Sequence, residues 1–131
     1  PNMIEEILDV EKKPLKAYHN LLMAQLEGAA RNPGLTRAHF QEPFLNGHYS
    51  PAINETFEHF LDALVEKLKP AMDAEGKRNL KLSITQTLSI IYFAALFPDL
   101  FKSFNGIDIR DPKARKKYIR HMMKKYFTDF S

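Results

Sequence analysis

The residues best placed for chemistry are the acidic and imidazole side chains of one predicted helix. Glu55 and His59 stand four residues apart, and Asp62 and Glu66 continue the same face. Side chains at this spacing are neighbours on a helix, where they could bind a metal ion or act as an acid and base pair. Because the face lies opposite the apolar stripe of the helix, we predict a solvated ladder of charges and no reactive site.

The other signatures of enzymes do not occur in the sequence. There is no cysteine, no nucleophile motif of the form Gly-x-Ser-x-Gly, no phosphate-binding loop and no dinucleotide fingerprint. The histidines lack the His-x-x-x-His spacing of a metal site. They are His19, His39, His48, His59 and His121. We therefore predict that the chain is not an enzyme and holds no metal or other cofactor.

Composition places the chain among soluble globular proteins. Its 131 residues suit one domain, and 44% hydrophobic with 27% charged residues is ordinary. Without cysteine or a secretion signal, we expect a cytoplasmic protein. The first residue is Pro1 and not methionine, and a helix is predicted already at Ile4 to Val10, so we expect a fragment of a longer protein. The net charge is −3 over residues 1–100 and +6 over residues 101–131, so the basic character is local.

Apolar residues recur with a helical period along the whole chain, and convincing strands are absent. The clearest helix opens at Ser50-Pro51, and another opens at Asp111-Pro112. Each pair is a capping residue followed by a proline at the first helical position. Glu75-Gly76 is expected to end the first of them. The predicted helices are Ile4 to Val10, Leu15 to Ala30, Leu35 to Leu45, Ser50 to Met72, Leu80 to Phe97 and the basic helix after Asp111. The fold class is therefore all-α, a helical bundle of about six helices.

The last third of the chain predicts a protein partner. Residues Leu88 to Phe97 are apolar almost all round, but ten residues are too few for a membrane span of about 20. A domain this small cannot bury both sides of such a helix. We therefore expect one side to pack on its own domain and the other on a second subunit.

The basic helix that follows allows more than one interpretation. Its cations on one side are Lys113, Lys117, Arg120 and Lys124. Such a face is typical of helices that lie on anionic lipid or nucleic acid, and equally of a packed helix with a wet outer surface. We expect the wet surface, with no membrane association.

An aromatic cluster in the middle of the chain is the best candidate for ligand binding. Its members are Phe40, Phe44, Phe57 and Phe60. Aromatic residues at helical spacing are either filled core or the walls of a cavity, and the pattern leaves both open. Polar residues near them, among them His39, Thr85 and Tyr92, would suit a cavity with a few convergent polar groups.

The order of these elements resembles a known family. The resemblance is carried by the stretches Asn32-Pro33-Gly34-Leu35 to Gln41-Glu42-Pro43-Phe44-Leu45, the Ser50-Pro51 start, Glu75-Gly76 and the final apolar and basic helices. Together they look like the C-terminal regulatory domain of TetR-family transcriptional repressors. The resemblance implies that residues 1–131 form a single ligand-binding and dimerisation domain, of which residues 1–10 are the tail of a linker helix. The helix-turn-helix of that family is absent from this chain, so DNA would be bound only through the missing domain.

The resemblance also implies two sets of residues. The helices around the cluster would enclose an apolar or amphipathic inducer, and the last two helices would pair with their copies as a four-helix homodimer interface. The expected ligand-binding residues are Tyr18, Leu22, His39, Phe40, Phe44, Phe57, Phe60, Leu64, Thr85, Leu88 and Tyr92. The expected interface residues are Ile90, Phe93, Leu96, Phe97, Tyr118, Met122 and Tyr126. The alternative is a free-standing helical module that binds small molecules, lipids or another protein.

Overall fold

The computed structural model describes residues 13–127 and 130, and within them every regular element is a helix. The elements are α2 (Pro14–Arg31), α3 (Pro33–Asn46), α4 (Pro51–Leu68), the 3₁₀ turn η1 (Lys69–Ala71), α5 (Ala74–Arg78), α6 (Leu80–Leu96), α7 (Pro98–Asn105) and α8 (Pro112–Tyr126). The all-α class is confirmed. The helix expected at Ile4 to Val10 and the linker role of residues 1–10 lie outside the described residues.

Proline fixes where most of these helices begin. The described helices that start on a proline are α2, α3, α4, α7 and α8. The first position of a helix needs no N–H partner, and the fixed φ of proline already suits it. Asp111 completes the start of α8 by accepting a hydrogen bond from the Lys113 backbone N–H. The predicted starts at Pro51 and Pro112 are confirmed.

The predicted end of the long helix is wrong. Helix α4 stops at Leu68, and Glu75 and Gly76 belong to the separate short helix α5. Pro70 explains the break, because it lacks an N–H and its ring clashes with the carbonyl four residues earlier. Asp73 then caps α5, its Oδ1 accepting from the Gly76 N–H at 2.7 Å.

Helix α7 was not expected from the sequence, which suggested only a connection there. Pro98 is its first residue, and Gly106 follows its end with a left-handed φ of 70°. The Gly106 N–H donates a hydrogen bond to the Lys102 carbonyl. Both ends follow the usual pattern of proline at the start and glycine after the end. The described part of the chain therefore has seven α-helices.

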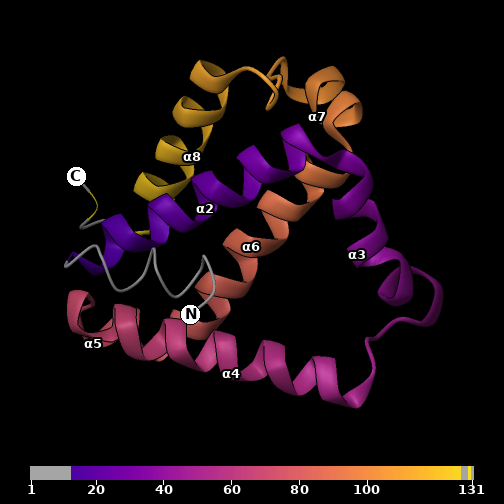
Figure 1. The fold of residues 1–131 in the computed structure, drawn as a ribbon. Helices are drawn as coiled ribbons and strands as arrows, with labels where there is room; N and C mark the ends of the chain where they lie inside the picture. Colours follow the sequence, from indigo (N-terminus) through magenta and orange to yellow (C-terminus); the bar gives the residue numbers. More distant parts are fainter. Residues whose placement is uncertain (1–12, 128–129, 131) are drawn as a thin grey trace.

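Helix α2 lies at the centre of the domain. It packs against α6 and α8, while α4 covers another side of α6 and α3 bridges from the end of α2 to the start of α4 (Figure 1). Its fully buried side chains are Ala17, Tyr18, Leu21, Leu22 and Leu26. Burying each leucine contributes about 1.5 to 3 kcal/mol relative to an exposed one.

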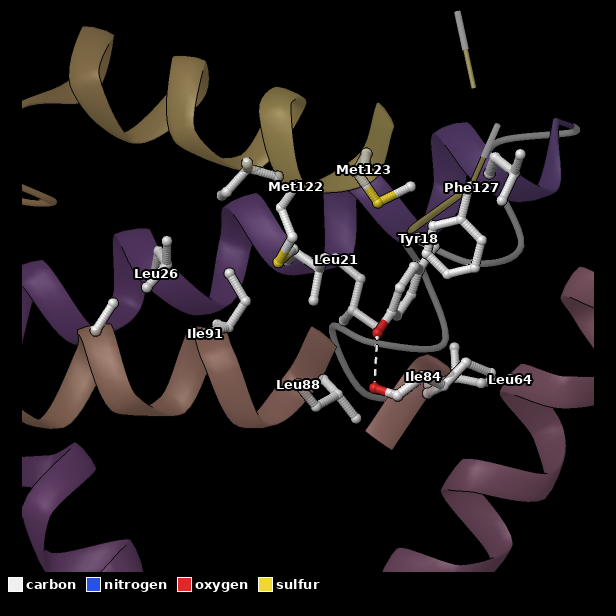
Figure 2. Close-up of a cluster of buried hydrophobic side chains, with 14 of the residues drawn as sticks. Tyr18, Leu21, Leu26, Leu64, Ile84, Leu88, Ile91, Met122, Met123 and Phe127 are labelled. Carbon is white, nitrogen blue, oxygen red and sulfur yellow. Dashed lines mark hydrogen bonds between the residues drawn. The ribbon is translucent and has the colours of Figure 1, made fainter. Parts of the chain in front are cut away.

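The core is continuous between α2, α6 and α8. Figure 2 shows Leu21 and Ile91 facing Met122 and Met123 of α8, with the ring of Tyr18 beside Phe127. The Tyr18 and Phe127 rings meet edge to face at 5.8 Å. This packing holds α2 and α6 in place, and both helices then contribute to the cavity described below.

The apolar run of α6 is buried on one side only. Ile84, Ile91 and Ala94 are fully buried, whereas Phe93 and Phe97 are 39% and 41% exposed. Within the described residues no single helix has the length and composition of a membrane span; α6 and α7 reach them only together, across a bend of 104°.

Candidate ligand cavity

A cavity of about 630 Å³ lies between α2, α3, α4 and α6. Its volume falls in the range of small-molecule sites, about 300 to 1,000 Å³. The residues around it are Ala24, Gln25, Gly28, Ala29, Asn32, Leu35, Thr36, His39, Phe40, Thr56, Phe57, Phe60, Ile91, Tyr92 and Ala95. Apolar atoms form most of this surface.

A second cavity of about 280 Å³ adjoins the first and shares part of its wall. The shared residues are Phe40, Phe57, Phe60 and Tyr92. The smaller space also touches Tyr49, Asn54, Leu61, Thr85, Leu88 and Ser89. The aromatic side chains thus form a partition between the two cavities.

The aromatic wall is built from rings on three helices and one loop. The Phe40 ring of α3 meets the Tyr92 ring of α6 at 4.9 Å, and the Phe57 ring of α4 stacks on Tyr49 at 5.1 Å. The Tyr49 hydroxyl donates to the His39 carbonyl at 3.0 Å, which ties the loop before α4 to α3. Phe40, Phe57 and Tyr92 are only half-buried, as expected for rings that border a hollow.

Two polar side chains of the cavity wall interact with each other, Gln25 of α2 and Tyr92 of α6. The Gln25 Oε1 atom is buried and accepts no hydrogen bond. Burial raises the pKa of the Tyr92 phenol, an effect partly opposed by hydrogen bonding from the Gln25 side chain. The phenol is therefore neutral at physiological pH.

Most residues predicted to bind ligand do border these spaces. His39, Phe40, Phe57, Phe60 and Tyr92 surround the larger cavity. Thr85 and Leu88 border the smaller one. The aromatic cluster is thus a wall of the cavity over much of its surface.

The remaining predicted residues lie elsewhere. Tyr18, Leu22 and Leu64 are fully buried in the core and do not reach either cavity. Phe44 is 63% exposed and borders a groove on the outer side of α3, together with Phe97. Core and cavity are both apolar, so a helical stripe of leucines does not distinguish them.

The sequence predicts a contribution of α2 to the cavity, but through Tyr18 and Leu22 and not through the residues that border it. Ala24, Gln25, Gly28 and Ala29 lie on one face of that helix, at a spacing of four residues. Small residues repeated on one face leave room beside a helix, and this signal was available in the sequence. Ile91 and Ala95 of α6 were missed as well.

The residues expected at a dimer interface divide into two groups. Leu96 and Met122 are buried within the domain, whereas Phe93 and Phe97 are exposed and Ile90, Tyr118 and Tyr126 are half-buried. A chain of ring contacts runs from α3 to α8, partly on this surface and, at Phe101, in the core beneath it. It runs Phe44, Phe97, Phe93, Phe101 and Tyr118, with successive centroids 5.0 to 6.2 Å apart. We call these five residues the aromatic band.

The charged face of α4 is a surface ladder, as expected. The side chains of Glu55 and His59 are 70% and 74% exposed, and Glu55 Oε1 lies 4.0 Å from His59 Nε2. Asp62 forms an ion pair with Lys81 of α6. No group of three or more metal-binding side chains converges among the described residues. Exposed ion pairs of this kind contribute little to the free energy of unfolding, about 0 to 1 kcal/mol each.

No protein-family model, curated protein or solved structure matches this chain.

Proposed function

We propose that this chain is the small-molecule-sensing and dimerisation domain of a TetR-like transcriptional repressor. The observation that supports it best is the cavity of about 630 Å³ between α2, α3, α4 and α6, where the resemblance places an inducer. Its walls are apolar, and its few polar groups come from different helices. An apolar or amphipathic small molecule would fit these properties.

Ligand binding would act by changing the population of helix arrangements. A molecule in the cavity contacts four helices, so it favours the arrangement that fits it best, by no more than its difference in binding energy. α2 borders the cavity through Gln25 and Gly28 and begins at Pro14, next to the proposed linker. A shift of α2 would thus alter the spacing of the DNA-binding heads.

The homodimer would use the exposed side of α6 with α7 and α8. The aromatic band supplies apolar area on this side, and Leu100 and Phe104 extend it at 44% and 67% exposure. Large exposed apolar patches mark interaction sites. An obligate homodimer buries on the order of 2,000 Å² or more, and pairing of this side with its copy would cover the band.

Ligand binding is tested with N-phenyl-1-naphthylamine, a neutral dye whose emission rises in apolar surroundings. We expect saturable fluorescence and a higher melting temperature, because a ligand that binds only the folded state adds about 2.7 kcal/mol at 100 times its Kd. The Gly28→Leu variant should abolish binding by filling the cavity, since the space beside Gly28 is open.

Gly34→Leu is the matched control. Gly34 borders the outer groove instead of the cavity, and its surroundings are equally open. Binding that Gly34→Leu removes and Gly28→Leu leaves intact would contradict the proposal. The coding sequence upstream of Pro1 separates a repressor from a free-standing carrier, because only the repressor requires a helix-turn-helix there.

A further inference from the structure

The outer side of α8 carries positive charge that no acidic side chain of the helix offsets. The sequence from Pro112 to Tyr126 contains no Asp or Glu. Six of its lysine and arginine residues are exposed, and none of the six forms an ion pair within the described residues. They are Lys113, Lys116, Lys117, Arg120, Lys124 and Lys125. Such a surface attracts an anionic partner.

Four of these cations form a row along α8. Successive members are three or four residues apart, so they lie on one side of the helix. With a rise of 1.5 Å per residue, the row is about 16 Å long. Its members are Lys113, Lys117, Arg120 and Lys124.

The start of α2 adds to this charge. The end of α8 lies beside the start of α2 (Figure 1), and just beyond it the Phe130 ring stacks on the His19 ring at 5.5 Å. Burial lowers the pKa of His19 most, and the charges of Lys16, Lys116 and Arg120 lower the pKa further. Cations of both helices therefore lie near one imidazole. We call the combined surface the cationic face, formed by Lys16, Lys113, Lys116, Lys117, Arg120 and Lys124.

The packing of α8 favours a nucleic acid over a membrane. A helix that lies on a membrane inserts its apolar side among the lipid chains. In α8 that side is already buried in the core through Ile119, Met122 and Met123, and no large apolar side chain of α8 is among the exposed ones of the described residues. The remaining attraction is electrostatic, and duplex DNA presents one charge per about 1.7 Å of its axis. A row of about 16 Å would therefore face on the order of ten phosphate charges.

The proposed homodimer leaves the cationic face open. Tyr118, the member of the aromatic band on α8, is one residue from Lys117 and two from Arg120, and side chains at these spacings do not share a side of a helix. Two copies of the cationic face would also repel each other. The face is therefore available to a third molecule.

We propose that the cationic face binds the phosphate backbone of duplex DNA without sequence preference. This inference goes beyond the proposed function, because it concerns a surface outside the cavity and holds for the chain without any ligand. Phosphate contacts fix position and orientation on a duplex but do not read its sequence. In a repressor they would add to the affinity of the DNA-binding domain.

The test is the fluorescence anisotropy of labelled DNA duplexes of two unrelated sequences, titrated with this chain at rising NaCl concentration. We expect the same Kd for both duplexes. Contacts with roughly five phosphates release their counterions, so log Kd should rise by about 4.5 per unit of log salt concentration. A preference for one duplex, or a Kd that does not depend on salt, would overturn the proposal.

Two matched variants locate the contact. Lys117→Gln with Arg120→Gln removes two charges from the cationic face, and glutamine has a helix propensity close to theirs. This double variant should raise Kd about tenfold at about 50 mM NaCl and lower the salt slope by about 2. Arg37→Gln with Lys102→Gln removes the same two charges from α3 and α7 and should leave Kd within about twofold. Equal effects of the two double variants would show attraction to net charge alone and overturn the proposed site. Circular dichroism establishes that both are folded.

Other polyanions decide the class of partner. Vesicles of phosphatidylserine and phosphatidylcholine and a polyglutamate peptide are tested as competitors of the labelled duplex at equal charge concentration. Weaker competition by both than by unlabelled duplex would support DNA. Stronger competition by the vesicles would assign the face to a membrane surface, and stronger competition by polyglutamate would assign it to an acidic protein segment. Either of these results would overturn the proposal.

Discussion

The Tyr18 hydroxyl and the Thr87 hydroxyl lie 2.6 Å apart in the core and join α2 to α6 across 69 residues of sequence. Tyr18 also donates to the Ile84 carbonyl at 3.3 Å, the bond drawn in Figure 2. Both Tyr18 and Thr87 are fully buried. This pair joins two of the four helices that border the cavity.

Removing either hydroxyl should destabilise the domain moderately. Tyr18→Phe and Thr87→Val should each lower the free energy of unfolding by about 1 to 2 kcal/mol, because a buried polar group loses its partner. The double variant should cost less than the sum of the two, since both partners are then gone. Urea denaturation measures all four proteins. Tyr49→Phe, whose hydroxyl bond to His39 is exposed, is the control and should cost less; strict additivity would contradict the coupling.

Acidification should destabilise the fold through His19. Burial lowers the pKa of His19, and the nearby cations Lys16, Lys116 and Arg120 lower it further, whereas a side-chain bond to Asn20 opposes them. A His with a lowered folded pKa stabilises the fold above its unfolded pKa of about 6.5. That stability is lost as pH falls below this value.

The measurement is the melting temperature between pH 7.5 and pH 5 for wild type and His19→Gln. The decline should be smaller in His19→Gln. His121→Gln changes an exposed histidine of α8 and should keep the wild-type slope. Identical slopes for all three proteins would exclude His19 as the cause.

Helix order and several helix boundaries followed from the sequence, because proline and glycine act locally. Pro51 and Pro112 mark two helix starts, whereas the helix predicted over Ser50 to Met72 runs through Pro70, which in the structure lies just after the end of α4. The missed α7 has a proline start and a glycine end, but its eight residues are too few for the apolar period to stand out.

Only part of the cavity wall could be predicted from the sequence. Clustered aromatic residues such as Phe57 and Phe60 predicted one wall, while Leu22 and Leu64 followed the same apolar pattern and lie in filled core. Periodicity gives the buried face of a helix but not the distance to the next helix. That distance depends on packing angles between α2, α4 and α6, which local sequence does not specify.

Shortening a side chain of the cavity wall should lower the free energy of unfolding less than shortening one of the core. Leu64→Ala removes a fully buried side chain and should cost about 2 to 5 kcal/mol. Phe60→Ala should cost less, although phenylalanine is larger, because one side of its ring already faces a void. Urea denaturation compares the two. A larger loss for Phe60→Ala would indicate that its ring is packed on all sides.

Two glycines should respond in opposite ways to alanine. Gly28→Ala should stabilise the domain by about 0.5 to 1 kcal/mol, because alanine favours the helix and its methyl group meets open space. Gly106→Ala should destabilise it by about 1 kcal/mol, since Gly106 has a φ of 70°. Thermal denaturation measures both. Loss of stability in Gly28→Ala would mean that the cavity is closed over that position.

The proposed homodimer depends on Phe93, at the middle of the aromatic band. Its ring contacts Phe97 at 5.7 Å and Phe101 at 6.2 Å, yet it is 39% exposed. In a two-fold dimer Phe93→Glu would bury an unpaired charge on both subunits, at a cost of at least about 3 kcal/mol. The dimer Kd should rise by more than about 100-fold.

Sedimentation equilibrium at micromolar concentration should show wild type at twice the mass of the chain and Phe93→Glu at the mass of a monomer. Ile53→Glu is the matched control, because Ile53 is 41% exposed but lies on α4, which contributes no ring to the band. That variant should remain dimeric. A monomeric wild type would rule out the dimer. If Ile53→Glu dissociated the dimer and Phe93→Glu left it intact, the interface would lie on α4 and not on the side of α6 that exposes Phe93.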